Sequence, residues 1–524
     1  MGTKNVVRTV AAALSMLIAF AAGPIGQAVA QQEAAEPTNA QLLERIEALE
    51  KALAELRKQP PGSPTAATAA CEPAESPASR PASTVAVKRA PAGEAPPPAT
   101  TQGEAGGVST SDVARSDAPA VQAAGERPAV EAKPAKATAG YKDGYFIASG
   151  DGSYKLKLGG YLQADGRSFV DGGSDDVNQF TIRRARLDLR GTLATRFGFR
   201  LMPDFSDSDL TLQDAYVEAD FAPWLELRAG KFKTPFGLER LQGSTDLPFV
   251  ERGLTSNLAP GRDVGVRLGG DVWDGRLDYK LAVLNGVPDG DDGDTDVNDA
   301  VDVVARLFAT PFSTSMYSPF RGVGVGLAAT YGREQGSSSN EQLPKFKTAG
   351  RATFFRYTEE GDDAVADGDH YRVSPQALWY EGSFGLLTEY VRSSQQVSRD
   401  DERAWVANDA WQIRSSYLLT GEKASMDGVV PNAPFDFGGG HWGAWELALR
   451  WSSLDVDNTA FKKGFADPAE SARHADGLAA AINWYLNRNV ALYLHYEHTT
   501  FGGGDDTGDR ENEDVFLTRM QVVF

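Results

Sequence analysis

Basic and apolar side chains alternate along residues 179–191, QFTIRRARLDLRG. Successive side chains of a β-strand point to opposite faces, so this pattern predicts a strand with one charged face and one apolar face. The charged face carries Arg184, Arg186 and Arg190, and the apolar face carries Leu187 and Leu189. Guanidinium groups offer planar pairs of donors to phosphate and carboxylate, so the charged face predicts anion binding. A strand of a soluble protein would bury its apolar face in a core. A strand of a transmembrane barrel instead turns its apolar face to lipid and its charged face to a water-filled lumen.

Further basic side chains fall on the same wet face by strand parity, and others flank a long connection at residues 234–262. A row of moderate sites lets an anion move along a pore without being trapped. The predicted anion-binding residues are Arg184, Arg186, Arg190, Arg228, Lys231, Lys233, Arg262, Arg267, Lys280 and Arg306. Carboxylates on or near these faces leave a second interpretation open, in which the arginines pair with acids and stiffen the wall. Those carboxylates are Asp188, Asp204, Asp214, Glu218, Glu226 and Asp278.

The connection at residues 234–262 is the longest in the first half of the predicted sheet, and we expect it to fold into the lumen as the third outer loop. Its apolar residues would suit packing against the inner wall. These are Phe236, Leu238, Leu241, Leu247, Pro248 and Phe249.

Alternating segments separated by turns continue from residue 141 to residue 524, as is typical of an all-β transmembrane barrel. The predicted strands are 154–170, 183–193, 197–205, 210–221, 224–233, 264–273, 276–284, 301–312, 322–331, 371–380, 384–392, 411–419, 442–454, 477–486, 490–499 and 514–524. This gives sixteen antiparallel strands, an even number, if residues 349–357 lie in an outer loop; eighteen strands is the alternative. Short connections at 222–223, 274–275, 382–383 and 487–488 predict periplasmic turns. Long polar connections at 286–300, 395–410, 455–476 and 501–513 predict outer loops.

The N-terminal segment has a different composition. Residues 1–30 carry Lys4 and Arg8, an apolar run and an Ala-x-Ala site, which predicts a signal peptide. Residues 33–58 show a leucine heptad pattern, which predicts a short helical coiled coil in the periplasm. Residues 59–140 are rich in Ala and Pro and predict a disordered linker before the barrel at 141–524. The formal net charge of −20 argues against nucleic acid as a partner, and the lone Cys71 excludes an intramolecular disulfide.

Several motifs resemble the phosphate-selective porins O and P of Gram-negative outer membranes. They are RRARLDLRG at 183–191, QDAYVEADFAPWLELRAGKFKTPFGLER at 213–240, ERGLTSNLAPGRDVGVRLGG at 251–270, WGAWELALRW at 442–451, INWYLNRN at 482–489 and RMQVVF at 519–524. The resemblance implies a sixteen-stranded trimeric barrel in the outer membrane, with the third outer loop in its lumen. It implies lipid, lipopolysaccharide and phosphate or other small anions as partners.

Three other classes of function compete with a selective pore. An enzyme within a barrel would need a nucleophile supported by His, and none of the five histidines stands in such a motif, so no catalytic residue, metal site or cofactor is predicted. A general, weakly selective porin would carry the same barrel with a balanced wall. A tether that links the outer membrane to the cell wall could be an added role of the N-terminal arm.

Overall fold

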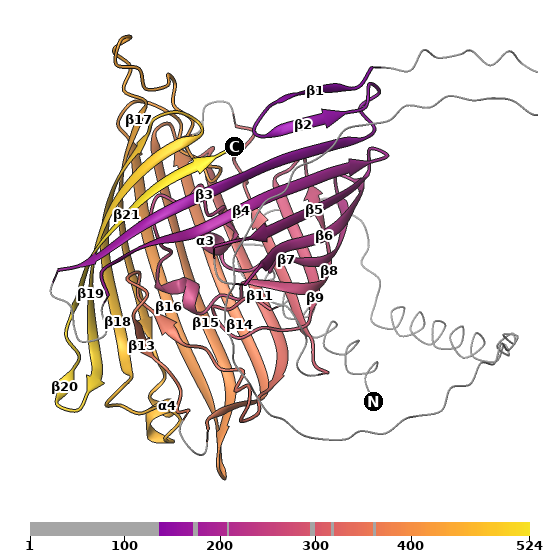
Figure 1. Cartoon of the computed structure of the whole chain (residues 1–524). Coiled ribbons are helices and arrows are strands. Elements are labelled where there is room, and N and C mark those ends of the chain that lie inside the picture. Colours follow the sequence, from indigo (N-terminus) through magenta and orange to yellow (C-terminus); the bar gives the residue numbers. More distant parts are fainter. Residues whose placement is uncertain (1–135, 171–176, 207–208, 294–298, 316–318, 360–362) are drawn as a thin grey trace, which may run out of the picture. The chain divides into compact units, whose positions relative to one another are not determined.

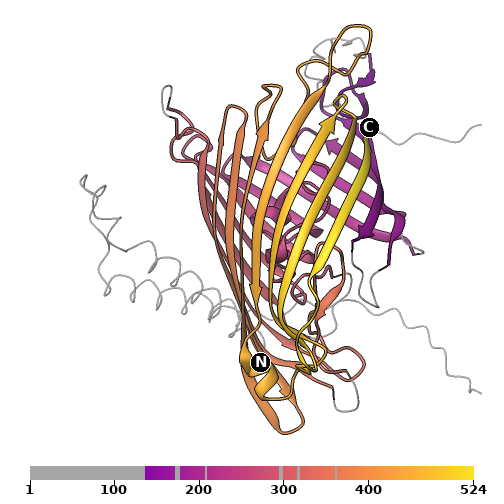
Figure 2. The same cartoon turned by 90° about the vertical axis from the view of Figure 1, so that its left-hand side faces the viewer.

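The computed structural model describes residues 136–170, 177–206, 209–293, 299–315, 319–359 and 363–524. The predicted signal peptide and coiled coil, and most of the predicted linker, lie outside these residues. The described residues form an antiparallel β-barrel (Figures 1 and 2). Its strands alternate apolar and polar side chains, which turns one face of each strand outward and the other to the lumen.

Sixteen strands make the barrel, and pairing of β21 with β3 closes it. They are β3 (Lys155–Phe169), β4 (Gln179–Leu193), β5 (Phe197–Asp204), β6 (Thr211–Ala222), β7 (Leu225–Lys233), β8 (Arg262–Val272), β9 (Leu277–Leu284), β10 (Asp302–Ala309), β11 (Val323–Gln335), β14 (Val365–Glu381), β15 (Phe384–Arg399), β16 (Glu402–Leu418), β17 (Ala444–Asp455), β18 (Ala472–Tyr485), β19 (Val490–Asp505) and β21 (Glu513–Val523). This confirms the sixteen predicted strands.

The elements outside the barrel wall are short. A hairpin, β1 (Thr138–Tyr141) and β2 (Tyr145–Ala148), precedes the barrel, and its first strand starts within the range predicted as linker. The pair β12 (Phe346–Lys347) and β13 (Thr353–Phe355) lies in the connection between β11 and β14, where residues 349–357 were predicted to be loop. The remaining elements are α3 (Leu238–Leu241), η2 (Leu254–Asn257), α4 (Asn458–Lys462) and β20 (Gly508–Asp509). In the described part of the chain, no helix is long and apolar enough to cross a membrane.

The two ends of the barrel differ in their connections. Short turns follow β4, β6, β8, β14 and β18 at the end that the sequence predicts to be periplasmic, at the top of Figure 1. Two connections there are longer, residues 310–322 between β10 and β11 and residues 419–443 between β16 and β17, which the expectation of short periplasmic turns did not foresee.

The prediction of a long outer loop at residues 395–410 is wrong. β15 continues to Arg399 and β16 begins at Glu402, so a tight turn joins them. Both strands extend beyond the apolar band, so their outward residues become polar, and polarity alone resembles a loop. The strict pairing from Phe384↔Tyr417 to Arg399↔Glu402 shows that the strand period persists.

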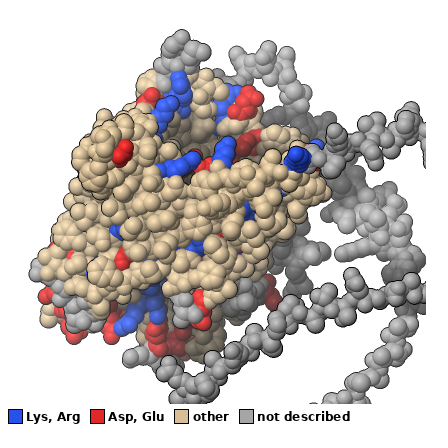
Figure 3. All heavy atoms as spheres, turned by 45° about the horizontal axis from the view of Figure 1, so that its top comes forward, with Lys and Arg blue, Asp and Glu red and all other residues tan. Residues whose placement is uncertain are grey.

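The outer wall is apolar between the two ends, as Figure 3 shows by its scarcity of charged side chains there. Leu187, Leu449, Phe516 and Met520 are exposed on this wall. Aromatic side chains, including Trp224, Trp273 and Trp442, are exposed near the periplasmic ends of strands, as expected at a membrane interface.

Candidate functional site

Loop L3 (residues 234–261) joins β7 to β8 and carries α3 and η2. Glu389 on β15 binds both turns. Its carboxylate accepts hydrogen bonds from the backbone N–H of Leu238 at 2.6 Å and from the hydroxyl of Thr255 at 3.1 Å. The first N–H groups of a helix have no partner within the helix, so a carboxylate there satisfies them. One wall side chain therefore fixes the loop at two places.

Arginines of the wall hold the middle of L3. Arg414 on β16 donates to Glu239 Oε1 at 2.9 Å, and Arg450 on β17 donates to the backbone carbonyl of Glu251 at 2.9 Å. Arg183 on β4 donates to the Glu251 carboxylate at 2.5 Å. These residues are mostly buried, so each charge depends on its partner for stabilisation.

Amide side chains from further strands fasten the tip of L3. Asn483 on β18 donates to the carbonyl of Pro248 at 2.9 Å, and Gln521 on β21 donates to the carbonyl of Thr245 at 3.0 Å. In the strand order, β18 lies on the far side of the barrel from β7 and β8. L3 therefore crosses the lumen and reaches the opposite wall.

An apolar cluster fills the lumen beside L3. Phe236, Leu254 and Leu258 of L3 pack with Phe346 and Phe354 of the β11–β14 connection. The cluster also includes wall residues of β15–β19 and residues 456–466 of the β17–β18 connection. Three loops thus share one core on the β14–β19 side of the lumen, and L3 cannot move there without breaking that core.

The predicted anion-binding residues lie on the other side, from β4 to β10, in an alternating series of bases and acids. Asp188 accepts from Arg190 at 2.6 Å and from Arg200 at 2.8 Å, and Arg200 pairs with Asp214 at 2.9 Å. Asp214 in turn accepts from Arg262 at 2.9 Å. We call this series and its continuation on β6–β10 the basic ladder.

The ladder continues through Glu226, which pairs with Arg228 at 3.0 Å and also with Arg267. Asp278 pairs with Lys280 at 2.8 Å and with Arg306 at 3.0 Å. These four carboxylates thus each lie between two bases, and Glu218 on β6 pairs with Arg228 at 2.6 Å. The wall-stiffening pairs that the sequence left open are present along the ladder.

Four of the predicted residues, Arg184, Arg186, Lys231 and Lys233, differ from this pattern. Arg186 pairs with Asp204 at 2.6 Å. Arg184 donates to the amide oxygen of Gln163 at 2.8 Å, and Gln163 donates to the carbonyl of Ser244 in L3. Lys231 is buried on β7.

Lys233 and two arginines of L3 form a group whose main partners are backbone carbonyls. Lys233 Nζ donates to the carbonyls of Leu241 and Gln242 at 3.2 and 2.8 Å, and Arg252 donates to the same Gln242 carbonyl at 3.1 Å. Arg240 donates to the Gly290 carbonyl at 2.5 Å and lies 3.9 Å from Asp292. Burial and the nearby Arg240 lower the pKa of Arg252 to about 10. Carbonyls orient these cations without cancelling their charge, so this group, called the L3 basic group, can attract an anion.

Sequence reasoning missed Arg183, Arg240 and Arg252. A register shift between Gln163 and Ala164 leaves Arg183 without a Cα partner on β3, so both Arg183 and Arg184 contact residues inside the barrel. No periodicity reveals such a bulge in advance. Arg240 and Arg252 stand in the predicted loop, where strand parity gives no orientation, and only the residues at its two ends were selected.

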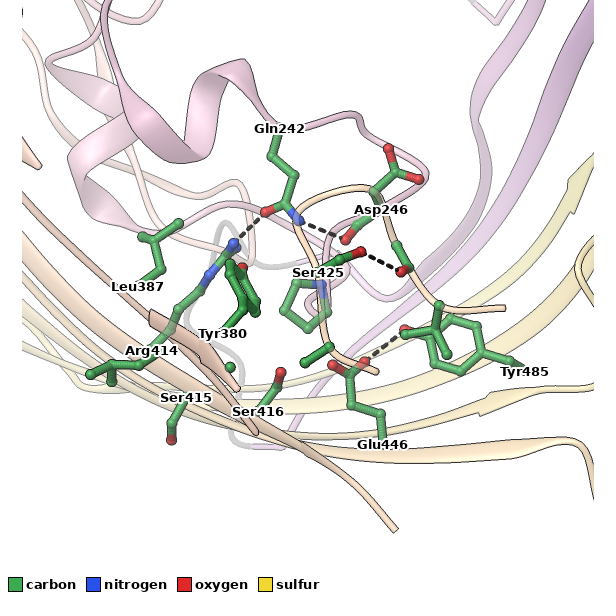
Figure 4. Close-up of a pocket in the computed structure, with 16 residues that line it drawn as sticks. Gln242, Asp246, Tyr380, Leu387, Arg414, Ser415, Ser416, Ser425, Glu446 and Tyr485 are labelled. Atoms are coloured by element: carbon green, nitrogen blue, oxygen red, sulfur yellow. Dashed lines mark hydrogen bonds between the residues drawn. The ribbon is translucent and has the colours of Figure 1, made fainter. Parts of the chain in front are cut away.

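The periplasmic connection at residues 419–443 meets L3 inside the barrel (Figure 4). Gln242 of L3 donates to the carbonyl of Met426 at 3.0 Å and accepts from Arg414. A cavity of about 20 Å³ separates the two segments and is lined by Gln242, Asp246, Glu446 and Tyr485 among others. That is room for about one water molecule, so L3 is supported from the periplasmic side as well as from the wall.

Residues 156–524 match the family model of the phosphate-selective porins O and P. The chain belongs to this family. It is 25% identical to Porin O of Pseudomonas aeruginosa over 435 residues, which covers 73% of this chain and 91% of that protein. It is therefore a porin of the Gram-negative outer membrane, from a family of channels rather than catalysts.

Solved porin structures align with most of the chain. The outer membrane channel DcaP of Acinetobacter baumannii aligns with a TM-score of 0.47 and 11% identity, covering 71% of this chain and 98% of that one. An anion-selective porin from Comamonas acidovorans aligns with a TM-score of 0.45 and 13% identity, covering 71% of this chain and 100% of that one.

Proposed function

We propose that this porin lets small anions, phosphate or polyphosphate among them, diffuse passively across the outer membrane. The observation that carries the proposal is the L3 basic group, in which Lys233 and Arg252 donate to the same Gln242 carbonyl and, among the described residues, have no carboxylate as their main partner. A cationic constriction raises the local concentration of anions and excludes cations. The name of the family points to the same substrate class.

In this proposal the basic ladder continues the path from L3 to the periplasmic end. Each ladder arginine has a carboxylate neighbour that competes with a passing anion. An anion is therefore bound for a short time at each step, which conduction requires. The apolar cluster confines the path to the β4–β10 side of the lumen.

The test is ion selectivity in planar bilayers, read as the reversal potential under a KCl gradient, followed by titration of phosphate into the chloride current. We expect anion selectivity and block by phosphate. Arg252→Ala or Lys233→Ala should weaken that block about tenfold, which corresponds to about 1.4 kcal/mol of binding free energy. Arg510→Ala removes the same charge near the outer end of the barrel and should leave the block unchanged. If phosphate blocks the current equally well in all three variants, the L3 basic group is not the anion site.

A general, weakly selective diffusion porin is the second candidate. The ion pairs of the ladder favour it, because a balanced wall discriminates little between cations and anions. In that case the reversal potential stays near zero and phosphate does not block. The arm that could then tether the membrane to the cell wall lies outside the described residues.

We also propose that the porin is a homotrimer embedded among lipid and lipopolysaccharide. The family resemblance and the heptads at residues 33–58 support this. Mass measurement of the native particle in detergent tests the trimer, and deletion of residues 33–58 tests whether the heptads contribute to it.

A further inference from the structure

The β1–β2 hairpin occupies a step in the barrel seam. β21 pairs with β3 only from Tyr161 onward, which leaves the edge of residues 155–158 open. The second hairpin strand fills this edge with the register Tyr145↔Leu158 to Ala148↔Lys155. Unpaired strand edges are costly next to lipid, so the hairpin completes the wall. It precedes the residues that match the family model.

One face of the hairpin continues the lipid-facing surface. Tyr145 and Ile147 pair with Leu158 and Leu156, so all four side chains share the outward face. Tyr145 is 60% exposed and Ile147 is 58% exposed. Leu158 pairs with Leu189, which belongs to the apolar face of β4. The hairpin therefore extends the band that contacts lipid at its periplasmic margin.

The free edge of the hairpin limits how deep it lies. Among the described strands β1 pairs only with β2, and its outer N–H and C=O groups need water or lipid headgroups as partners. Exposed Lys142 lies in the turn between β1 and β2, next to Tyr141. Lys155 lies on the opposite face of the strand pair, with its ammonium 5.4 Å from the centroid of the Phe146 ring. Aromatic residues next to lysines are typical of the headgroup zone.

The hairpin is also fastened to the barrel. Asn489 in the β18–β19 turn donates to the hydroxyl of Tyr141 at 2.6 Å, and the neighbouring Arg488 pairs with Asp143. The hairpin is thus held in place at the step in the wall.

We propose that the β1–β2 hairpin is a membrane anchor that binds phospholipid of the periplasmic leaflet. Tyr145 and Ile147 insert at the headgroup boundary, and Lys142 contacts lipid phosphates. Anionic headgroups bind more strongly, because each lysine near an anionic surface adds favourable electrostatic free energy.

The first test uses bimane attached to Ile147→Cys in a Cys71→Ser background, with the full chain in liposomes. Leu187→Cys is the control within the apolar band, and Asp506→Cys is the control in water. We expect a nitroxide on the lipid headgroup to quench position 147 at least as strongly as position 187, and aqueous iodide to quench it less than position 506. If iodide quenches position 147 as strongly as position 506, the hairpin faces water and the anchor is refuted. If neither agent quenches position 147, a second copy of the protein covers this face and the anchor is also refuted.

The second test counts phosphatidylglycerol molecules that stay bound in native mass spectrometry. We expect the Lys142→Ala variant to retain at least twofold fewer than the wild type. Lys345→Ala, in an outer loop, is the control and should retain as many as the wild type. Equal retention in the Lys142→Ala variant would refute the contact between this lysine and lipid phosphates.

Discussion

The two sides of the barrel use the same residue type in opposite ways. On the ladder side, β5, β9 and β10 have 8 residues each, and the exposure of the arginine side chains ranges from 52% for Arg190 to 7% for Arg267 and Arg306. On the loop side, β14 and β16 have 17 residues each, and the side chains of Arg372 and Arg450 are fully buried. An arginine that borders water can exchange its carboxylate for a passing anion. An arginine sealed between a wall and a loop serves to hold the loop.

Arg372 illustrates the second role. It binds Asp289 at 2.5 Å and the carbonyl of Val287 at 2.6 Å, both in the β9–β10 connection, and Asp302 of β10 at 3.1 Å. That connection is therefore tied to the loop side in the same way as L3. Position in the barrel, rather than charge, separates the two roles.

The largest effect should come from the loop side. Glu239→Ala removes the carboxylate that Arg414 and Gln412 bind, and leaves a buried charge without its partner, which typically costs about 3–5 kcal/mol. We expect the free energy of unfolding in urea to fall by this amount and the single-channel conductance to rise as L3 loosens.

The matched control is Glu402→Ala, whose partner Lys463 is exposed. An exposed pair contributes at most about 1 kcal/mol, so this variant should unfold like the wild type. If the two variants lose the same free energy of unfolding, the burial of an ion pair does not decide how much it stabilises the barrel.

A smaller change should follow on the ladder side, in selectivity rather than stability. Asp278→Asn removes the acid shared by Lys280 and Arg306 and leaves two cations facing the lumen. We expect the reversal potential under a KCl gradient to shift toward the anion value. Glu497→Gln, next to buried Arg450, should leave selectivity unchanged and lower stability. If Asp278→Asn lowers only stability and Glu497→Gln shifts only selectivity, the roles assigned to the ladder side and the loop side are reversed.

The smallest effect should come from the contact between L3 and the periplasmic connection. Gln242→Ala removes the hydrogen bond to the carbonyl of Met426 and the one from Arg414. We expect the free energy of unfolding to fall by about 1–3 kcal/mol. The loss stays this small because Arg414 keeps its pair with Glu239. We also expect more frequent fluctuations of the single-channel current. Ser425→Ala, which removes a hydrogen bond within the connection itself, is the control. Quiet current in both variants would show that this contact does not steady L3.

Strands could be predicted from the sequence because lipid and water impose a period of two on every segment that spans the membrane. The same rule failed at residues 395–410, where β15 and β16 rise above the lipid and their outward residues become polar. It could not reveal the hairpin at Thr138, which is too short to show a period. The residues of L3 were located as a loop, but their partners were not. Contacts such as Asn483 with Pro248 depend on the register of strands far along the chain.

The fastenings of L3 have a consequence for assembly. Its partners Glu389, Arg414, Arg450 and Gln521 follow their L3 contacts by 151, 175, 199 and 276 residues. Contacts so distant in sequence form late, because the intervening chain must first be ordered. The narrow part of the channel therefore forms last, after the strands that hold L3 in place. A barrel that has closed before L3 is ordered would have an unrestricted pore and would conduct solutes without selection.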